Sequence, residues 1–239
     1  PVDVYVAPRP PAPPVPMPEP APDIGKGAAW RQYALAAPDT GGKPMIAIVI
    51  DDMGMDRKRS ARVTGLPGPL TLSFLTYAEE LDRQTRAARA KGHELMLHVG
   101  MEPGSKAVDP GPNVLLTSDT PAEIRRRLTW GLDRFTGFVG INNHMGSKFT
   151  ESREGMAVVM AELKDRGLLF LDSRTTPRSV GAELARKSGV PAVERNVFLD
   201  NKNDVAAVKA RLAEVERVAR RTGSAIAIGH PRDATLAAL

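Results

Sequence analysis

The chain has 239 residues, 42% of them hydrophobic and 26% charged, proportions typical of a globular protein with one large domain or two small ones. It contains no cysteine, which excludes disulfide bonds, zinc–thiolate sites and thiol nucleophiles. The net charge of +5 is spread over arginine-rich segments such as 125–127 and 217–221. Such segments are typical of solvated helix faces, so the sequence does not predict nucleic acid binding.

Residues 1–43 are predicted to form a Pro-rich flexible spacer, and residues 44–239 one folded domain. Ten of the 21 prolines lie within residues 1–25. Proline fixes φ and removes a backbone donor, which favours an extended polyproline II chain over a packed core. The spacer is either a stalk or a plain tail. Because the chain starts at Pro1 rather than Met, we expect a processed product, and a membrane tether preceding Pro1 is compatible with this.

From Met45 onward, short apolar runs alternate with amphipathic helical stretches. The helix after Thr120 has a capping box and a proline at its first position, and two later helices are predicted to end near Gly167 and Gly223. This alternation predicts an α/β fold with a parallel sheet, either open or closed into a barrel. Seven runs are predicted as strands: 45–50, 70–75, 95–97, 135–141, 168–171, 190–193 and 225–228.

Polar residues interrupt this pattern at the carboxyl ends of the predicted strands. In βα folds these ends form the functional face, so residues from five strands are expected to meet at one rim. His93 starts its strand with the opposite side-chain parity to His98 and is predicted to be structural. The residues expected at the rim are Asp51, Asp52, His98, Asn142, Asn143, His144, Asp172 and His230.

Asp51 and Asp52 form the sharpest signal in this set. Two adjacent carboxylates after a buried strand repel each other, and a bound cation relieves that repulsion. Aspartate and histidine ligands suit a divalent metal, most often Zn²⁺, which activates water and polarises carbonyl groups. The sequence therefore predicts a Zn²⁺ site, with the second carboxylate free to act as a base.

Three motifs resemble those of polysaccharide deacetylases. Residues 48–54 (IVIDDMG) resemble the first motif of the NodB-type enzymes, and residues 92–98 (GHELMLH), followed by Glu102-Pro103, resemble the second. Residues 142–147 (NNHMGS) bring the chain closer to the divergent polysaccharide deacetylase family. The resemblance covers about residues 45–235 and implies that residues 44–239 form a deacetylase-like catalytic domain. It implies a distorted seven-stranded (β/α) barrel in a periplasmic or cell-envelope protein.

The resemblance also implies roles for individual residues. Asp51 matches the catalytic base, Asp52 the metal-ligating aspartate, His98 the first metal-ligating histidine and His230 the general acid. The chain departs from the NodB-type enzymes in two places. Glu102 stands where those enzymes have the second histidine of the metal site, and their third motif is replaced around Asn142–Ser147. The third ligand is therefore either Glu102 or His144, and imidazole is the commoner zinc ligand. The residues expected to contact substrate are Asn142, Asn143 and Asp172.

Two functions fit these features. The first is a metal-dependent hydrolase that removes N-acetyl groups from an envelope polysaccharide or a peptidoglycan-like glycan. The second is a non-catalytic envelope module that binds glycan or a protein partner through the same rim, which the departures from the family motifs and the Pro-rich spacer favour. A metal-dependent phosphoesterase is a third possibility, but the sequence has no phosphate-cradling glycine loop.

Overall fold

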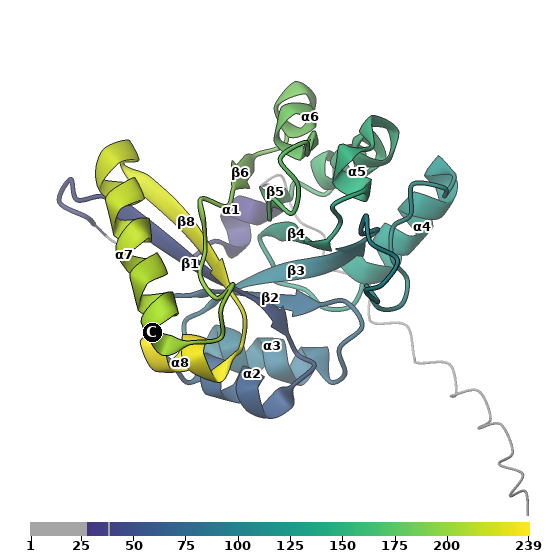
Figure 1. The fold of residues 1–239 in the computed structure, drawn as a ribbon. Coiled ribbons are helices and arrows are strands. Elements are labelled where there is room, and N and C mark those ends of the chain that lie inside the picture. Colours follow the sequence, from purple (N-terminus) through teal and green to yellow (C-terminus); the bar gives the residue numbers. More distant parts are fainter. Residues whose placement is uncertain (1–27, 38) are drawn as a thin grey trace, which may run out of the picture.

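The computed structural model describes residues 28–37 and 39–239, which form a curled parallel sheet with helices around its outside (Figure 1). The strands follow the order β6-β5-β4-β3-β2-β1-β8-β7, and every pair of neighbours is parallel. The distorted (β/α) barrel is therefore confirmed, although the sheet has eight strands. The strands are β1 (Met45–Met53), β2 (Thr71–Leu75), β3 (Glu94–Met101), β4 (Gly140–Met145), β5 (Leu169–Asp172), β6 (Ala192–Glu194), β7 (Val197–Phe198) and β8 (Ser224–Gly229).

The helices cover the outside of the sheet, and the boundaries predicted at Thr120 and Gly223 are confirmed. The Thr120 hydroxyl caps the helix that starts at Pro121, and Gly223 ends the longest helix in the left-handed conformation. The helices are α1 (Ala29–Tyr33), α2 (Arg57–Thr64), α3 (Leu81–Ala90), α4 (Pro121–Leu132), the 3₁₀ turn η1 (Phe149–Glu151), α5 (Arg153–Asp165), α6 (Gly181–Ser188), α7 (Val205–Thr222) and α8 (Asp233–Ala238).

The extra strand arises because one bent segment, residues 192–198, pairs with both edges of the sheet. Its first part, β6, pairs with β5, and its last part, β7, pairs with β8. Between them, the Arg195 backbone N–H donates to Asp172 O at 3.0 Å and the next residue, Asn196, donates to Ile226 O at 2.9 Å. This switching segment brings the two edges of the sheet together. The predicted seventh strand is thus β8, and β7 is the strand that the sequence analysis missed.

The predicted strand over 135–141 was wrong at its start, because β4 begins only at Gly140. Phe135 and Phe138 instead lie in the turn after α4, where they pack edge to face in the core. Gly137, with φ of +85°, allows this turn. β1, β3 and β4 also extend further than predicted, so the polar residues of the expected rim lie within the last residues of these strands.

Two layers of apolar side chains hold the sheet. The larger one lies between the sheet and the helices, and the predicted helix stripe of Met156, Val159, Met160 and Leu163 is fully buried in it. The smaller layer includes Val49, Met96 and Ile228 and lies on the other face of the sheet. Because side chains alternate along a strand, this second face is also the one that carries Asp51 and His98.

Part of the expected spacer packs on the domain. The Trp30 backbone N–H donates to Gly167 O at 3.0 Å, the Leu35 N–H donates to Glu94 Oε2 at 3.3 Å, and Ala29 is buried. Residues 1–27, to which most of the spacer prediction applies, lie outside the described residues. The described part of the expected spacer is therefore in contact with the folded domain.

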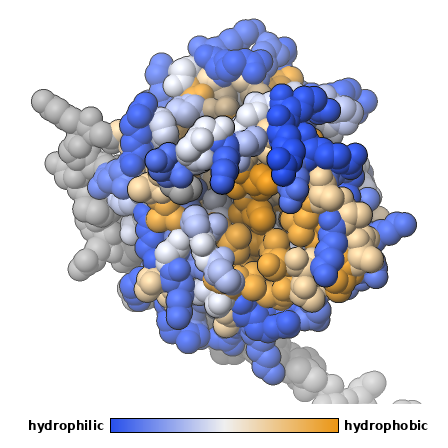
Figure 2. Space-filling view, turned by 90° about the vertical axis from the view of Figure 1, so that its left-hand side faces the viewer, coloured by the Kyte–Doolittle hydropathy of each residue, from blue (hydrophilic) through white to orange (hydrophobic). Residues whose placement is uncertain are grey.

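None of the helices that the structure describes is both apolar and long enough to cross a membrane. The face seen from the side of α7 has apolar side chains gathered at its centre, and hydrophilic side chains surround them (Figure 2). Met45 and Ile46, at the start of β1, are among the exposed large hydrophobic residues.

Candidate metal centre

A β-bulge brings two consecutive aspartates to one site. Neighbouring strand residues normally point to opposite faces, but the β1–β2 register shifts between Ile50 and Met53 by one extra residue on β1. Within this bulge Asp52 has a φ of +55°, a left-handed conformation that aspartate tolerates better than most residues. The Asp51 and Asp52 side chains therefore both line the same pocket.

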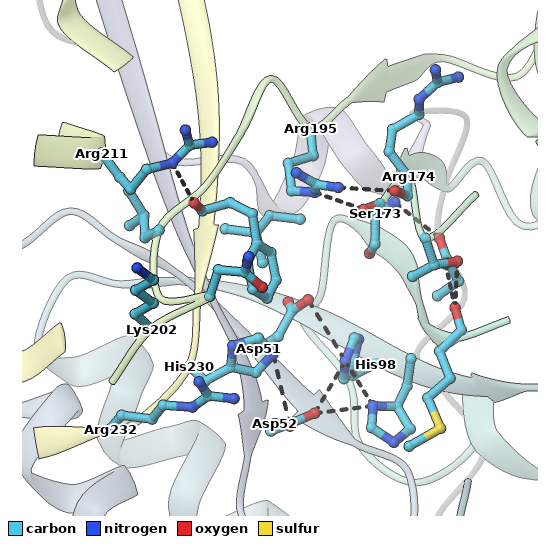
Figure 3. A pocket seen from close by; sticks show the side chains of 18 of the residues that line it. Asp51, Asp52, His98, Ser173, Arg174, Arg195, Lys202, Arg211, His230 and Arg232 are labelled. Carbon is cyan, nitrogen blue, oxygen red and sulfur yellow. Dashed lines mark hydrogen bonds and ion pairs between the residues drawn. The ribbon is translucent and has the colours of Figure 1, made fainter. Parts of the chain in front are cut away.

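Asp52, His98 and His144 converge on one point. Figure 3 shows Asp52 and His98 next to each other in the pocket. Asp52 Oδ1 lies 3.3 Å from His98 Nε2 and 3.0 Å from His144 Nδ1, and the two ring nitrogens are 3.3 Å apart. A tetrahedral zinc ion with ligand distances of about 2.0–2.1 Å places its ligand atoms about 3.3 Å apart. The triangle of donor atoms thus has the dimensions of one face of a zinc coordination shell.

The state of Asp52 supports a cation at this point. Its Oδ1 atom is buried and makes no hydrogen bond with any residue that the structure describes. Burial opposes its ionisation, but the imidazoles of His144 and His98 hold the pKa of Asp52 well below its usual range. A buried, ionised carboxylate oxygen beside two imidazole nitrogens fits a divalent metal of the zinc type.

Asn142 connects the candidate metal site to Asp51. Its side-chain oxygen lies 2.8 Å from His98 Nδ1, and its side-chain nitrogen donates to Asp51 Oδ1 at 2.8 Å. The Ser73 hydroxyl donates to the same Asn142 oxygen. An amide oxygen can only accept, so Nδ1 of His98 carries a proton, and in the neutral imidazole the Nε2 lone pair faces Asp52 and His144.

Asp51 is buried beside the candidate metal site. Only 3% of this residue is exposed, and its Oδ2 lies 3.6 Å from His98 Nε2. Burial raises the pKa of Asp51, against the nearby charges of His98 and His230. A carboxylate with a raised pKa is a stronger base than an exposed aspartate, which suits a group that accepts a proton from water.

His230 follows β8 and is held from behind by Asp200. Its Nδ1 lies 2.9 Å from Asp200 Oδ1, while its Nε2 faces the metal site, 3.9 Å from Asp52 Oδ2. Burial works against the charged imidazole, but Asp200 outweighs it and raises the pKa of His230. The Nε2 proton is therefore retained to higher pH, which suits a group that donates a proton.

These residues open into a pocket of about 760 Å³, within the range of about 300–1,000 Å³ that is usual for small-molecule sites. Asn143 lines it, and its side chain is fixed by Met145 O and by the Ser173 backbone N–H. Asn142 and Asp172 are fully buried and do not line it. Asp172 accepts hydrogen bonds from the Arg174 N–H and the Ser179 hydroxyl, so we assign it a supporting role in place of the expected substrate contact.

Glu102 lies outside the converging ligand set. Its Oε2 accepts hydrogen bonds from the Thr117 backbone N–H and hydroxyl, and its Oε1 is 2.6 Å from Lys148 Nζ. Of the two open alternatives for the third ligand, the geometry favours His144. His93 is fully buried and bonds Leu70 N and Thr64 O, which agrees with its predicted structural role.

Asp200 and Arg195 are site residues that the sequence analysis missed. Asp200 follows the apolar run 197–199, and this run could have identified it as another acid after a strand. The run is too short to stand out beside the longer strands. Arg195 gave no signal, because only the bend of the switching segment brings it to the pocket.

Residues 48–239 match the family model described as divergent polysaccharide deacetylase. The chain belongs to the divergent polysaccharide deacetylase family. Two relatives support this membership. The chain is 36% identical over 206 residues to the uncharacterized protein YibQ of Escherichia coli, and 34% identical over 196 residues to an uncharacterized protein of Haemophilus influenzae. The aligned regions cover 86% and 81% of this chain and 64% and 69% of those relatives.

One solved structure has the same fold as this chain over most of its length. The crystal structure of the uncharacterized protein ATU2773 from Agrobacterium tumefaciens matches with a TM-score of 0.84 and 30% identity. The match covers 88% of this chain and 86% of that one. The resemblance stated from the three sequence motifs is thereby confirmed at the level of family and fold.

Proposed function

We propose that the protein is a metal-dependent hydrolase that removes N-acetyl groups from a glycan of the cell envelope. The observation that carries this proposal is the triangle of Asp52, His98 and His144, with Asp51 and His230 beside it. Family membership supports a glycan substrate. We further propose Zn²⁺ as the metal, a periplasmic or envelope location, and a peptidoglycan-like or other N-acetylated polysaccharide as the partner.

Asp52, His98 and His144 would hold the metal. Bound there, it would supply a Lewis acid that polarises the acetamide carbonyl and makes a nearby water molecule more acidic. Asn142 keeps His98 in the tautomer that leaves Nε2 free for this purpose.

Asp51 and His230 then perform the proton transfers. Asp51 removes a proton from the water whose oxygen forms a bond to the carbonyl carbon. His230 Nε2 donates a proton to the amide nitrogen, which leaves as an amine when the carbon–nitrogen bond breaks. The products are acetate and a free amino sugar. The surroundings of the two groups suit these opposite roles. Burial raises the pKa of Asp51 and makes it a stronger base, whereas Asp200 stabilises the protonated form of His230.

Acetate release from N-acetylglucosamine oligomers by the zinc-loaded protein tests this proposal. Asp51→Asn and His230→Gln should each lower kcat by about 10²–10⁴-fold while the metal stays bound, because each removes one proton-transfer group. Asp233→Asn is the matched control, because Asp233 is an exposed residue just after His230 in the chain and pairs with Arg59; this change should leave kcat unchanged. If the folded, metal-loaded wild-type protein releases no acetate from any N-acetylated glycan, the chain is a binding module instead.

A further inference from the structure

One wall of the pocket is strongly basic. Among the residues that the structure describes, the pocket is lined by five arginine or lysine side chains and by two acidic ones, Asp51 and Asp52. Both acids already belong to the proposed base and metal site. The basic residues are Arg174, Arg195, Lys202, Arg211 and Arg232.

Four of the five basic residues lie apart from the candidate metal ligands, and the fifth, Arg232, lies beside His230 (Figure 3). Arg174 follows β5, Arg195 lies in the switching segment and Arg211 is on α7. In Figure 3 these three side chains lie along the side of the pocket opposite Asp52, with Lys202 below Arg211. The acidic residues and histidines therefore lie on one side of the pocket, and most of its basic residues form a wall on the opposite side.

Arg195 is a rigid cation in this wall. Its Nε donates to Ser173 O at 2.7 Å and its Nη2 to Arg174 O at 2.8 Å, and its guanidinium stacks over the Phe198 ring at 5.3 Å. A guanidinium has five N–H donors, so three remain for another partner. Burial lowers the pKa of Arg195, and the nearby charges of Arg174 and Arg211 lower it further. An anion at this wall would relieve that crowding of positive charge.

The acidic residues of the chain neutralise only part of the wall. Arg174 pairs with Glu194 at 3.0 Å, and Arg211 pairs with Glu214. Within the described residues, neither Arg195 nor Lys202 has a carboxylate within 4.0 Å. Arg211 is also held in place by its Nε, which donates to Phe198 O at 3.0 Å. The wall thus presents fixed, incompletely neutralised donors to whatever enters the pocket.

We propose that the pocket selects N-acetylated saccharides that carry an anionic group, a carboxylate or a phosphate, which binds to Arg195, Lys202 and Arg211. This proposal rests on the proposed function for the placement of the acetamido group at the metal site. Arginine binds carboxylate and phosphate through paired N–H groups, and its fixed geometry makes the contact directional. The anionic group would then orient the sugar, so that its acetamido group reaches Asp51 and His230.

Binding measurements test the selection without needing turnover. Isothermal titration of zinc-loaded Asp51→Asn compares the disaccharide N-acetylglucosaminyl-N-acetylmuramic acid with its carboxyl methyl ester. A second pair compares N-acetylglucosamine 6-phosphate with N-acetylglucosamine. We expect the acid to bind at least about tenfold more tightly than its ester, or the phosphate at least about tenfold more tightly than the plain sugar, with the preference shrinking as salt is raised. The arm that shows the preference identifies the anionic group.

Variants of the wall then locate the contact. Arg195→Gln should abolish the preference, and Lys202→Gln, an exposed change that leaves the fold intact, should reduce it. Lys209→Gln removes the same charge from an exposed position of α7 outside the pocket and is the matched control. Equal affinities within both pairs, or no binding of any of the four probes, would overturn the proposal. A charge preference in a wild-type protein that releases no acetate would refute the proposed hydrolysis alone.

Kinetics separate selection from a direct effect on Asp51. If Arg195→Gln lowers kcat equally for the charged and the neutral member of a pair and leaves KM unchanged, Arg195 acts on the base rather than on the substrate. That result would also contradict the proposal. A rise in KM confined to the charged substrate would support it.

Discussion

Asp200 holds His230 at two points: its Oδ1 lies 2.9 Å from the ring Nδ1, and its Oδ2 accepts the His230 backbone N–H at 2.7 Å. The Thr235 hydroxyl donates to the same Oδ2 at 2.8 Å, and Asp200 itself is fully buried. The carboxylate therefore fixes both the backbone and the ring of His230. It also keeps the proton of the free ring nitrogen directed at the pocket.

Asp200→Asn tests this arrangement. The neutral amide no longer stabilises the imidazolium, so the pKa of His230 should fall. Because the acid must be protonated, activity is lost as pH rises through that pKa, and the alkaline limb of kcat should move to lower pH. We expect kcat at neutral pH to fall about 10–100-fold, as for carboxylates that orient metal-bound imidazoles. A pH–rate profile measures this. Asp233→Asn is the control, and an unmoved alkaline limb in a folded Asp200→Asn protein would contradict the positioning role.

Substitution of the candidate ligands separates His144 from Glu102. Asp52→Asn, His98→Gln and His144→Gln should each weaken zinc binding by at least about tenfold, because each removes one donor from the triangle. Asparagine is used at position 52 because it also accepts the left-handed backbone. Glu102→Gln should retain full zinc affinity, since its carboxylate bonds Thr117 and Lys148 instead. Competition with a chromogenic chelator provides the affinities, and loss of zinc from Glu102→Gln with retention in His144→Gln would reverse the assignment.

Zinc binding should strengthen with pH up to about 8. Burial lowers the pKa of His98, but Asp51 and Asp52 outweigh it and raise the pKa to about 8. Below that pH the metal-free protein holds a proton on Nε2, the atom that would bind the metal, and binding must displace it. Calorimetry at pH 7 in two buffers of different ionisation enthalpy should show proton release. Zinc binding that releases no proton at pH 7 would argue against His98 as a ligand.

Asn142→Ala should destabilise the protein as well as impair the site. The change leaves Asp51 Oδ1, Ser73 Oγ and His98 Nδ1 without their partner in a fully buried position. An unsatisfied buried polar group costs about 1–3 kcal/mol, so we expect a loss of at least that size in the free energy of unfolding. Urea denaturation measures it. Asn203→Ala, on an exposed loop, should change stability by less than about 0.5 kcal/mol. Equal stabilities of the two variants would mean that Asn142 does not connect Asp51 to the candidate metal site.

Truncation tests where the ordered domain begins. A chain starting at Ala28 should unfold at a higher temperature than one starting at Lys43, because the shorter chain loses the contacts of Trp30 with Gly167 and of Leu35 with Glu94. Thermal unfolding of the two purified chains measures the difference. Limited proteolysis should also yield a resistant fragment that retains α1. Identical melting temperatures would instead support a domain boundary near residue 43.

The sequence was sufficient to predict the strands that carry the candidate metal site, because each strand combines an apolar run with a polar residue at its end. Asp52, His98 and His144 could be found in this way, and so could the fold class. The sequence could not decide whether His144 or Glu102 is the third metal ligand. That choice depends on where the chain turns after β3, and no local sequence pattern determines this turn. Arg195 and Asp200 escaped notice for a related reason. Their strands have two or three residues each, and their pairing depends on how far the whole sheet curls.

The switching segment has one more consequence, for how the protein behaves at high concentration. A sheet edge exposes unpaired N–H and C=O groups that can template association with another chain. Here the edge strands are the two shortest in the sheet, with three residues in β6 and two in β7. The residues between them change partner from one edge to the other, which leaves no long flat edge at either end. The bend that brings Arg195 to the pocket thus also protects an eight-stranded sheet from edge-to-edge aggregation.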